Sequence, residues 1–213
     1  MITKRRGCFW AACCLSMLPL QAQFSRVTGF AGAGVSVPVQ NIGSRLDTGW
    51  SMSAGIGPKL GDRYGVLLDF MFSDTGVNRT TLDAVPAPDG TARTFGFTID
   101  PVVHLNANRE GSFDLYLTGG GGVYHRTVEF TQPVLVPFTV FDPFFGLIYP
   151  ATGVANQVIA SRTNVKGGLD IGGGVSWRLR QSKASLFAEA RYHYIYTAPT
   201  ATTLLPITFG IRW

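Results

Sequence analysis

In the last twelve residues of the chain, large apolar side chains occupy every second position. The segment reads TTLLPITFGIRW. Its apolar series is Leu205, Ile207, Phe209, Ile211 and Trp213. The positions between them are mostly small or polar and include one charge, Arg212. Because successive side chains of a β-strand point to opposite faces, this period predicts a strand with one apolar face.

The same two-residue period recurs along the chain and predicts seven further strands. They cover residues 26–39, 50–60, 64–72, 95–105, 113–130, 165–179 and 184–196. No comparable stretch shows the 3.6-residue period of a helix. Short links at 61–63, 108–111 and 181–183 alternate with the links at 40–49, 73–93, 131–162 and 197–201. This organisation predicts an all-β fold, an eight-stranded antiparallel up-and-down transmembrane β-barrel.

The amino-terminal residues have the pattern of a cleavable secretory signal peptide. Lys4, Arg5 and Arg6 precede about 14 mostly apolar residues at 7–20, and Ala22 offers a small residue for cleavage. The apolar run is too short to span a bilayer as a helix, which takes about 20 residues. We expect residues 1–22 to be the signal peptide and 23–213 to form one barrel domain. A lipoprotein signal that ends at Cys13 is the alternative.

Removal of residues 1–22 changes the composition of the chain. All three cysteines lie in that segment, so residues 23–213 can form neither a disulfide nor a thiolate site. Three basic residues leave with it, and 15 basic residues then face 13 acidic ones. Nucleic-acid binding needs a basic patch on the folded domain, so we expect no nucleic-acid partner.

The two faces of the predicted strands favour a membrane barrel. The apolar face carries aromatic residues toward both ends of the strands. Those near the short links are Tyr64, Phe113, Trp177 and Trp213, and those near the long links are Trp50, Phe72, Phe95, Tyr194 and Tyr196. The other face combines glycines with charges of both signs. Apolar residues outside and polar residues inside are typical of a transmembrane barrel. A secreted β-sandwich is the alternative, but it does not account for two aromatic girdles.

The charged residues of the inward face are expected to pair with one another. An eight-stranded barrel is only wide enough to be filled by side chains, and buried charges require partners. The predicted lumen charge network comprises Lys59, Asp69, Asp100, Lys166, Asp170, Arg178, Glu189 and Arg191.

The link over residues 131–162 lacks the composition of a solvated loop. Residues 131–160 contain one acid, no base and four prolines. We expect this link to fold back onto the barrel mouth. The alternatives are an apolar extension of the flanking strands and contact with a partner or lipopolysaccharide, since exposed apolar patches mark interaction sites. The prolines argue against a continuous strand. The candidate surface residues are Phe138, Phe141, Phe144, Phe145 and Tyr149.

With its signal peptide, its aromatic girdles and its LPITFGIRW ending, the chain resembles the small OmpA/OmpX-like bacterial outer-membrane β-barrel family over residues 24–213. The resemblance implies a multi-pass protein of the Gram-negative outer membrane with both termini in the periplasm. In that family the last strand is read by the assembly machinery, so the implied assembly signal is Phe209, Ile211 and Trp213. The implied partners are outer-membrane lipid, lipopolysaccharide, the barrel assembly machinery and periplasmic chaperones.

Catalytic motifs such as HExxH, a P-loop or GxSxG are missing from the sequence. We therefore expect no catalytic, cofactor or metal site, and we expect His104 and His193 to be hydrogen-bonded fillers of the lumen. Only His125 has the outward phase. The expected function is a structural, adhesive or surface-interaction role with an unidentified extracellular ligand. A narrow porin-like channel is the second interpretation, and a lipid A-modifying enzyme is the third.

Overall fold

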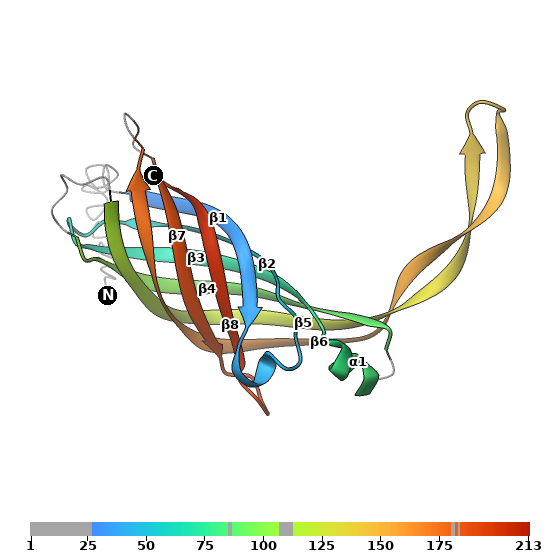
Figure 1. The fold of residues 1–213 in the computed structure, drawn as a ribbon, viewed down its shortest axis with the longest axis horizontal. Helices are drawn as coiled ribbons and strands as arrows, with labels where there is room; N and C mark the ends of the chain where they lie inside the picture. The colour runs from blue at the N-terminus through green and yellow to red at the C-terminus, as the bar shows by residue number, and fades with distance from the viewer. Residues whose placement is uncertain (1–26, 85–86, 107–112, 180–181, 183) are drawn as a thin grey trace, which may run out of the picture.

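The computed structural model describes residues 27–84, 87–106, 113–179, 182 and 184–213, which form strands and two short helices (Figure 1). The strands are β1 (Val27–Pro38), β2 (Gly49–Pro58), β3 (Tyr64–Gly76), β4 (Asp89–His104), β5 (Phe113–Asp142), β6 (Leu147–Arg178), β7 (Ser185–Ile195) and β8 (Thr202–Arg212). The helices are η3 (Gln40–Ile42) and α1 (Arg79–Ala84). Within these ranges no helix has the length and apolar character needed to cross a membrane. The predicted signal peptide lies outside the described residues.

The strands close into a ring. Each strand pairs antiparallel with its neighbour in sequence, and β1 pairs with β8 to complete the barrel. Ala33 of β1, for example, lies opposite Phe209 of β8. Closure removes the unpaired sheet edges that an open sheet would present. The prediction of an eight-stranded antiparallel barrel is confirmed.

Side chains alternate between the outer surface and the interior as the two-residue period requires. On β8, Phe209 is 60% exposed whereas its neighbour Thr208 is 5% exposed. On β3, Leu68 is 56% exposed whereas Asp69 is 2% exposed. The apolar side chains therefore cover the outside and the polar ones fill the inside, which is the reverse of a soluble barrel.

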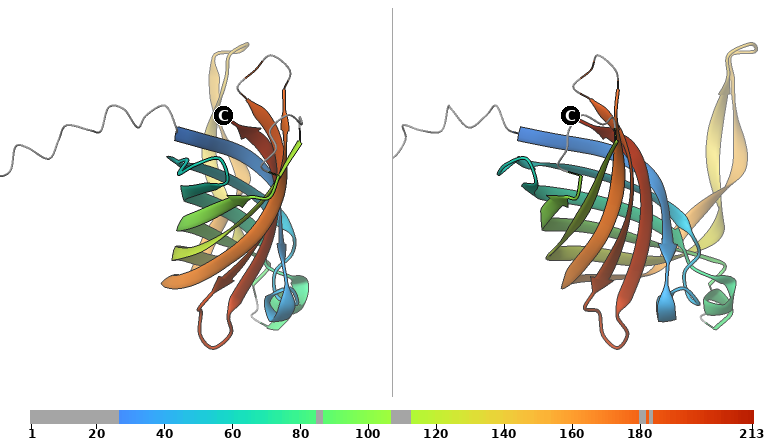
Figure 2. Two further views of the ribbon diagram at one scale, coloured as in Figure 1. Left: turned by 90° about the vertical axis from the view of Figure 1, so that its left-hand side faces the viewer. Right: turned by 60° about the vertical axis from the view of Figure 1, so that its left-hand side comes forward.

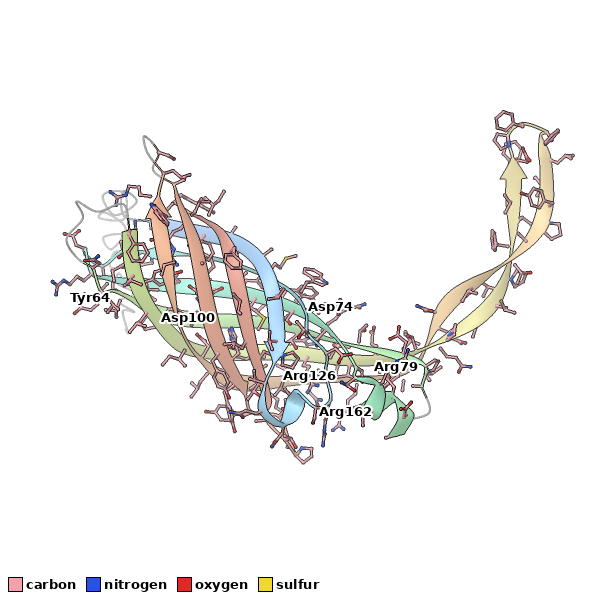
Figure 3. The ribbon with its side chains drawn as sticks, viewed as in Figure 1. Tyr64, Asp74, Arg79, Asp100, Arg126 and Arg162 are labelled. Atoms are coloured by element: carbon pink, nitrogen blue, oxygen red, sulfur yellow. The ribbon has the colours of Figure 1, made fainter. Side chains whose placement is uncertain are left out.

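The two ends of the barrel differ. The start of β1 and the end of β8 lie at the end where β2 turns into β3 (Figure 1). Tyr64 marks this end in Figure 3, while Arg79 and Arg162 lie toward the opposite end. The described connecting residues at 39–48, 77–84 and 196–201 are at the opposite end, and β5 and β6 extend from that end to the turn that joins them.

Two of these connections pack into an ordered cap. Ile42 and Leu46, from the β1–β2 connection, form an apolar cluster with Val77 and Leu82, from the β3–β4 connection. Leu46 and Val77 also form a β-bridge, and Asn78 N donates to Arg45 O at 2.8 Å. The cap therefore covers part of the mouth with packed side chains.

Strands β5 and β6 continue far beyond the barrel. Pairing of β4 with β5 ends at Asp89–Thr131, and pairing of β6 with β7 ends at Gly168–Ile195. Further out, β5 and β6 pair only with each other as far as Asp142–Leu147. We call this part, residues 131–158, the distal hairpin. It projects away from the barrel and turns to one side (Figures 1 and 2).

The expectation that this link folds back onto the barrel mouth is wrong, and the alternative of extended strands is correct. The prolines do not end the strands, because Pro133 and Pro137 lie within β5 and Pro150 lies within β6. In a two-stranded ribbon each strand keeps one free edge. A proline there loses no ladder hydrogen bond when its nitrogen faces that edge.

Candidate functional site

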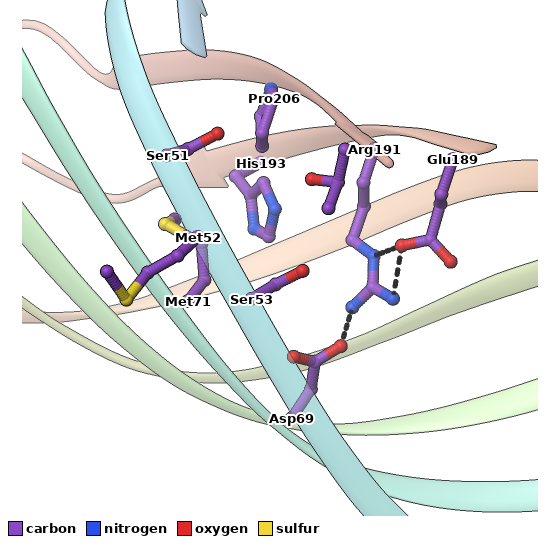
Figure 4. A pocket seen from close by; sticks show the side chains of 10 residues that line it. Ser51, Met52, Ser53, Asp69, Met71, Glu189, Arg191, His193 and Pro206 are labelled. Carbon is purple, nitrogen blue, oxygen red and sulfur yellow. Dashed lines mark hydrogen bonds and ion pairs between the residues drawn. The ribbon is translucent and has the colours of Figure 1, made fainter. Parts of the chain in front are cut away.

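The barrel interior holds a cluster of charged side chains centred on Arg191 of β7. Its Nη1 donates to Asp69 Oδ2 at 2.5 Å and to Asp100 Oδ2 at 2.6 Å. Its Nε and Nη2 lie 2.9 and 2.7 Å from Glu189 Oε1. Asp170 Oδ1 is 3.8 Å from Nη1. All five side chains are buried, and Figure 4 shows Arg191 between Glu189 and Asp69.

A second arginine, Arg212 of β8, extends this cluster. Its Nη2 lies 3.8 Å from Glu189 Oε2. Its guanidinium carbon lies 4.0 Å from the centre of the Tyr116 ring, with the Phe30 and Phe187 rings at 5.6 and 5.5 Å. Aromatic faces stabilise a cation through the ring quadrupole. Arg212 was not predicted for the network, although it is the one charge on the inward face of the last strand.

The structure corrects the predicted lumen network for three residues. Lys59, Lys166 and Arg178 are exposed. Lys59 follows the end of β2, Arg178 ends β6, and Lys166 lies beyond the last β6–β7 pair. The period of a strand gives the face of a side chain but not its depth, so residues near the barrel rims share the inward phase without being buried. The structure brings together the other five.

Glycines in β5 and β6 leave room for the cluster. A Cβ at Gly120 would lie 2.5 Å from Asp100 Oδ1 and 2.1 Å from Ile99 O. A Cβ at Gly172 would lie 2.9 Å from Arg191 Cγ. The inward-facing glycines at 120 and 122 of β5 and at 172 and 174 of β6 therefore form a wall without side chains, against which the charged groups pack.

We expect Gly120→Ala to destabilise the barrel by about 1–3 kcal/mol, because the added methyl group overpacks a site whose nearest atom is backbone. Gly167→Ala is the control, since a Cβ there meets only Gly122 O at 3.9 Å. Urea unfolding in detergent micelles measures both variants. Equal midpoints for the two would show that the glycine wall does not limit packing.

The three histidines occupy three different environments. Nδ1 of His193 lies 2.9 Å from Tyr124 Oη in the buried interior, and Nδ1 of His104 lies 2.6 Å from Asp114 Oδ2. His125 is exposed on the outer face, as its phase predicts. Its register neighbours are Phe95 and Val165, which supply neither a nucleophile nor an acid.

A small cavity beside Arg191 is lined by polar groups, including Ser51, Ser53 and His193 (Figure 4). Within the described ranges no set of three histidine, cysteine or carboxylate side chains is arranged to hold a metal ion. The acidic groups instead surround the Arg191 guanidinium, which occupies the position that a cation would take.

The distal hairpin exposes every candidate surface residue. Their exposed fractions are 49% for Phe138, 61% for Phe141, 93% for Phe144, 77% for Phe145 and 47% for Tyr149. The turn is closed by Asp142, whose Oδ1 accepts hydrogen bonds from Phe144 N and Phe145 N at 2.9 and 3.3 Å. The site thus combines an internal charge cluster with an external apolar element.

The barrel has the shape of known outer-membrane proteins. No protein-family model and no curated protein sequence matches the chain. Neisserial surface protein A is similar with a TM-score of 0.56 at 15% identity, over 87% of this chain and 95% of that one. Ail, the attachment invasion locus protein of Yersinia pestis, is similar with a TM-score of 0.51 at 17% identity, over 88% and 99%. A further structure holds Ail in complex with the heparin analogue sucrose octasulfate.

Identities this low establish the fold and nothing finer. The order of the strands, their closure into one ring and the two similarities agree with the pattern found in the sequence. The chain therefore has the fold of the small eight-stranded outer-membrane β-barrels.

Proposed function

We propose that this protein is an integral β-barrel of the bacterial outer membrane with a surface-interaction or adhesive role. In this proposal the barrel is the anchor and the distal hairpin is the contact element. The observation that carries it is the inverted barrel, whose exterior is apolar, joined to a long hairpin whose exposed residues are apolar as well. The names of the two similar proteins, a surface protein and an attachment protein, point in the same direction.

The apolar exterior supports the membrane location. Large apolar side chains at least half exposed occur on strands around the ring, among them Ile56, Leu68, Phe97, Ile99, Leu117, Val123, Leu169, Ile171 and Phe209. A continuous exposed apolar surface is typical of a membrane or protein interface. Trp177 and Trp213 are exposed toward one rim, and Trp50 and Tyr194 toward the other. Two aromatic girdles of this kind flank the lipid band of transmembrane barrels.

The filled interior supports an anchoring role over a channel. Arg191 joins carboxylates of β3, β4 and β7, so the charge cluster crosses the lumen. Side chains fill the interior of an eight-stranded barrel. The buried rings of Tyr116 and Tyr124 lie above and below this level on the same wall. We therefore propose that the lumen contributes stability and not transport.

The proposal also fixes the partners. Lipopolysaccharide would surround the rim from which the distal hairpin rises, and both termini would lie in the periplasm. Insertion would require periplasmic chaperones and the barrel assembly machinery, with Phe209, Ile211 and Trp213 as the recognised face of the closing strand. These three side chains are exposed on the outside of the barrel, where a protein can reach them before insertion.

Single-cysteine labelling tests this topology. Cysteines would replace Asn156 in the distal hairpin, Asp62 in the β2–β3 turn and Ser182 between β6 and β7, all of which are exposed. An impermeant maleimide applied to intact cells should label only the Asn156→Cys variant. All three variants should react after the cells are broken. Labelling of Asp62→Cys or Ser182→Cys in intact cells would reverse the orientation and reject the proposal.

A further inference from the structure

We propose that the tip of the distal hairpin inserts into the surface of a second, apposed lipid bilayer. This inference rests on the proposed function, because the hairpin must project from the cell to reach another membrane. It makes the contact partner a lipid surface with uncharged or zwitterionic headgroups.

The tip of the distal hairpin is a hydrogen-bonded turn that exposes its aromatic side chains. Phe144 and Phe145 are 93% and 77% exposed, and Leu147 and Ile148 beside them are 63% and 71% exposed. The turn that carries them is held by backbone groups. Gly146 N donates to Asp142 O at 2.9 Å, and Gly146 has a φ of 64°, which a residue without a Cβ adopts readily. The Asp142 carboxylate also accepts hydrogen bonds from Phe144 N and Phe145 N, so the single acid of the segment helps to close the turn while the two phenyl rings point away from it.

Near its tip the ribbon is apolar on both faces. One face carries Phe141 and Ile148, and the other carries Val140 and Tyr149. A strand ribbon that docks on a protein with one side keeps polar side chains on the other, as half-buried strands do. Two apolar faces instead suit a segment that an apolar medium surrounds.

The open edges of the ribbon limit how deeply it can enter. Beyond Thr131, β5 and β6 pair only with each other, so each has one edge of unpaired backbone groups. Such groups are costly in hydrocarbon, where no water is present to bind them. Insertion is therefore confined to the tip, at the depth of the headgroups and the first acyl carbons. Tyr149 and Pro150 follow the tip and suit that interface.

The charge of the segment selects the kind of membrane. Residues 131–160 contain one acid and no base. Recognition of lipopolysaccharide phosphates or of anionic lipids uses clusters of lysine and arginine. The distal hairpin thus has no means of holding an anionic surface and matches a zwitterionic one. The hairpin is also long enough to reach beyond the membrane that anchors the barrel. The 12 residues from Thr131 to Asp142 extend about 40 Å, which exceeds the thickness of a headgroup layer.

Vesicle flotation tests the inference with the full protein, isolated from outer membranes and reconstituted in nanodiscs. The nanodiscs are mixed with phosphatidylcholine vesicles, and the co-floating fraction gives a partition coefficient. We expect the wild type to float with the vesicles. Phe144→Ser with Phe145→Ser should lower the partition coefficient at least about ten-fold, since two phenyl rings no longer leave water.

The matched control is Leu135→Ser with Val154→Ser. These residues face each other near the base of the hairpin and are 73% and 69% exposed, so the control removes a similar apolar surface far from the tip. We expect it to change the partition coefficient less than about three-fold. Equal losses in the two double variants would show that the tip is not the inserting part and would overturn the inference.

Three further outcomes also overturn it. These are wild-type nanodiscs that do not float, binding that rises with phosphatidylserine content, and protein-bearing nanodiscs that pair with one another through the same two phenylalanines but do not bind empty nanodiscs. The last would identify a second copy of the chain as the partner. The Asn156→Cys labelling is independent of vesicles, so surface labelling without vesicle binding would reject the inference and leave the proposed function standing.

Discussion

Replacing Arg191 with methionine should lower the free energy of unfolding by about 3–5 kcal/mol or prevent refolding altogether, because removal of one partner leaves buried charges without compensation. Methionine keeps much of the side-chain volume but has no donors. The carboxylates of Asp69, Asp100 and Glu189 would lose contacts of 2.5 to 2.7 Å in the interior. Urea unfolding in lipid vesicles, followed by the heat shift on a gel, measures the loss.

Arg93→Met is the matched control. Arg93 also joins two carboxylates, with both Asp74 and Glu129 at 3.5 Å, but its side chain is 46% exposed. Exposed ion pairs contribute only about 0–1 kcal/mol, so this variant should unfold close to the wild type. If the Arg191 and Arg93 variants lose the same stability, burial does not strengthen the interior cluster and the lumen is wetter than we infer.

The second large effect concerns assembly, and we expect Trp213→Ala to reduce the folded outer-membrane fraction several-fold. The Trp213 ring packs over Gly29, where a Cβ would lie 2.8 Å from it. Trp213 and Gly29 also exchange backbone hydrogen bonds of 2.9 and 3.1 Å across the β1–β8 seam. Loss of the ring removes both the packing at the seam and the proposed assembly signal. Cell fractionation with heat-shift gels gives the folded fraction.

The Trp177→Ala variant distinguishes the loss of packing at the β1–β8 seam from the loss of any aromatic side chain of the girdle. Trp177 is 63% exposed on the outside of β6, against 56% for Trp213 on the same rim. Its loss removes similar lipid contact but leaves the closing strand intact, so the folded fraction should stay near that of the wild type. Equal losses in the two variants would assign the effect to lipid contact and remove Trp213 from the assembly signal.

The two-residue alternation of apolar and polar residues was enough to predict most of the fold. It predicted the number of strands and their inward and outward faces, because the alternation of a strand is a local geometric property. It also placed Asp69, Asp100 and Glu189 inside with the correct phase. The depth of a residue along the barrel axis is not a local property. The period therefore predicts Lys166 and Arg178 to lie in the interior, whereas the structure has them exposed.

Two features of the structure needed information that the pattern does not contain. The prolines of the distal hairpin argue against a continuous strand when only the sequence is known. A proline destabilises a strand only where a neighbouring strand would pair with its nitrogen, and the sequence does not show which edges are paired. The cap could not be predicted because Ile42 and Leu46 are distant in the sequence from Val77 and Leu82, and only the fold brings them into contact. Arg212 belongs to the cluster because the β1–β8 closure brings it beside Tyr116 and Glu189.

The seam between β1 and β8 has a consequence for the order of folding. All other strand pairs join neighbours along the chain, whereas Thr28 and Trp213, which bond across the seam, are 185 positions apart. A chain that has emerged only as far as β7 therefore presents two unpaired edges at once. Pairings of this separation form slowly because loop closure must come first. The barrel can consequently close only once β8 is available to pair with β1, and the unfinished sheet needs protection from aggregation until then.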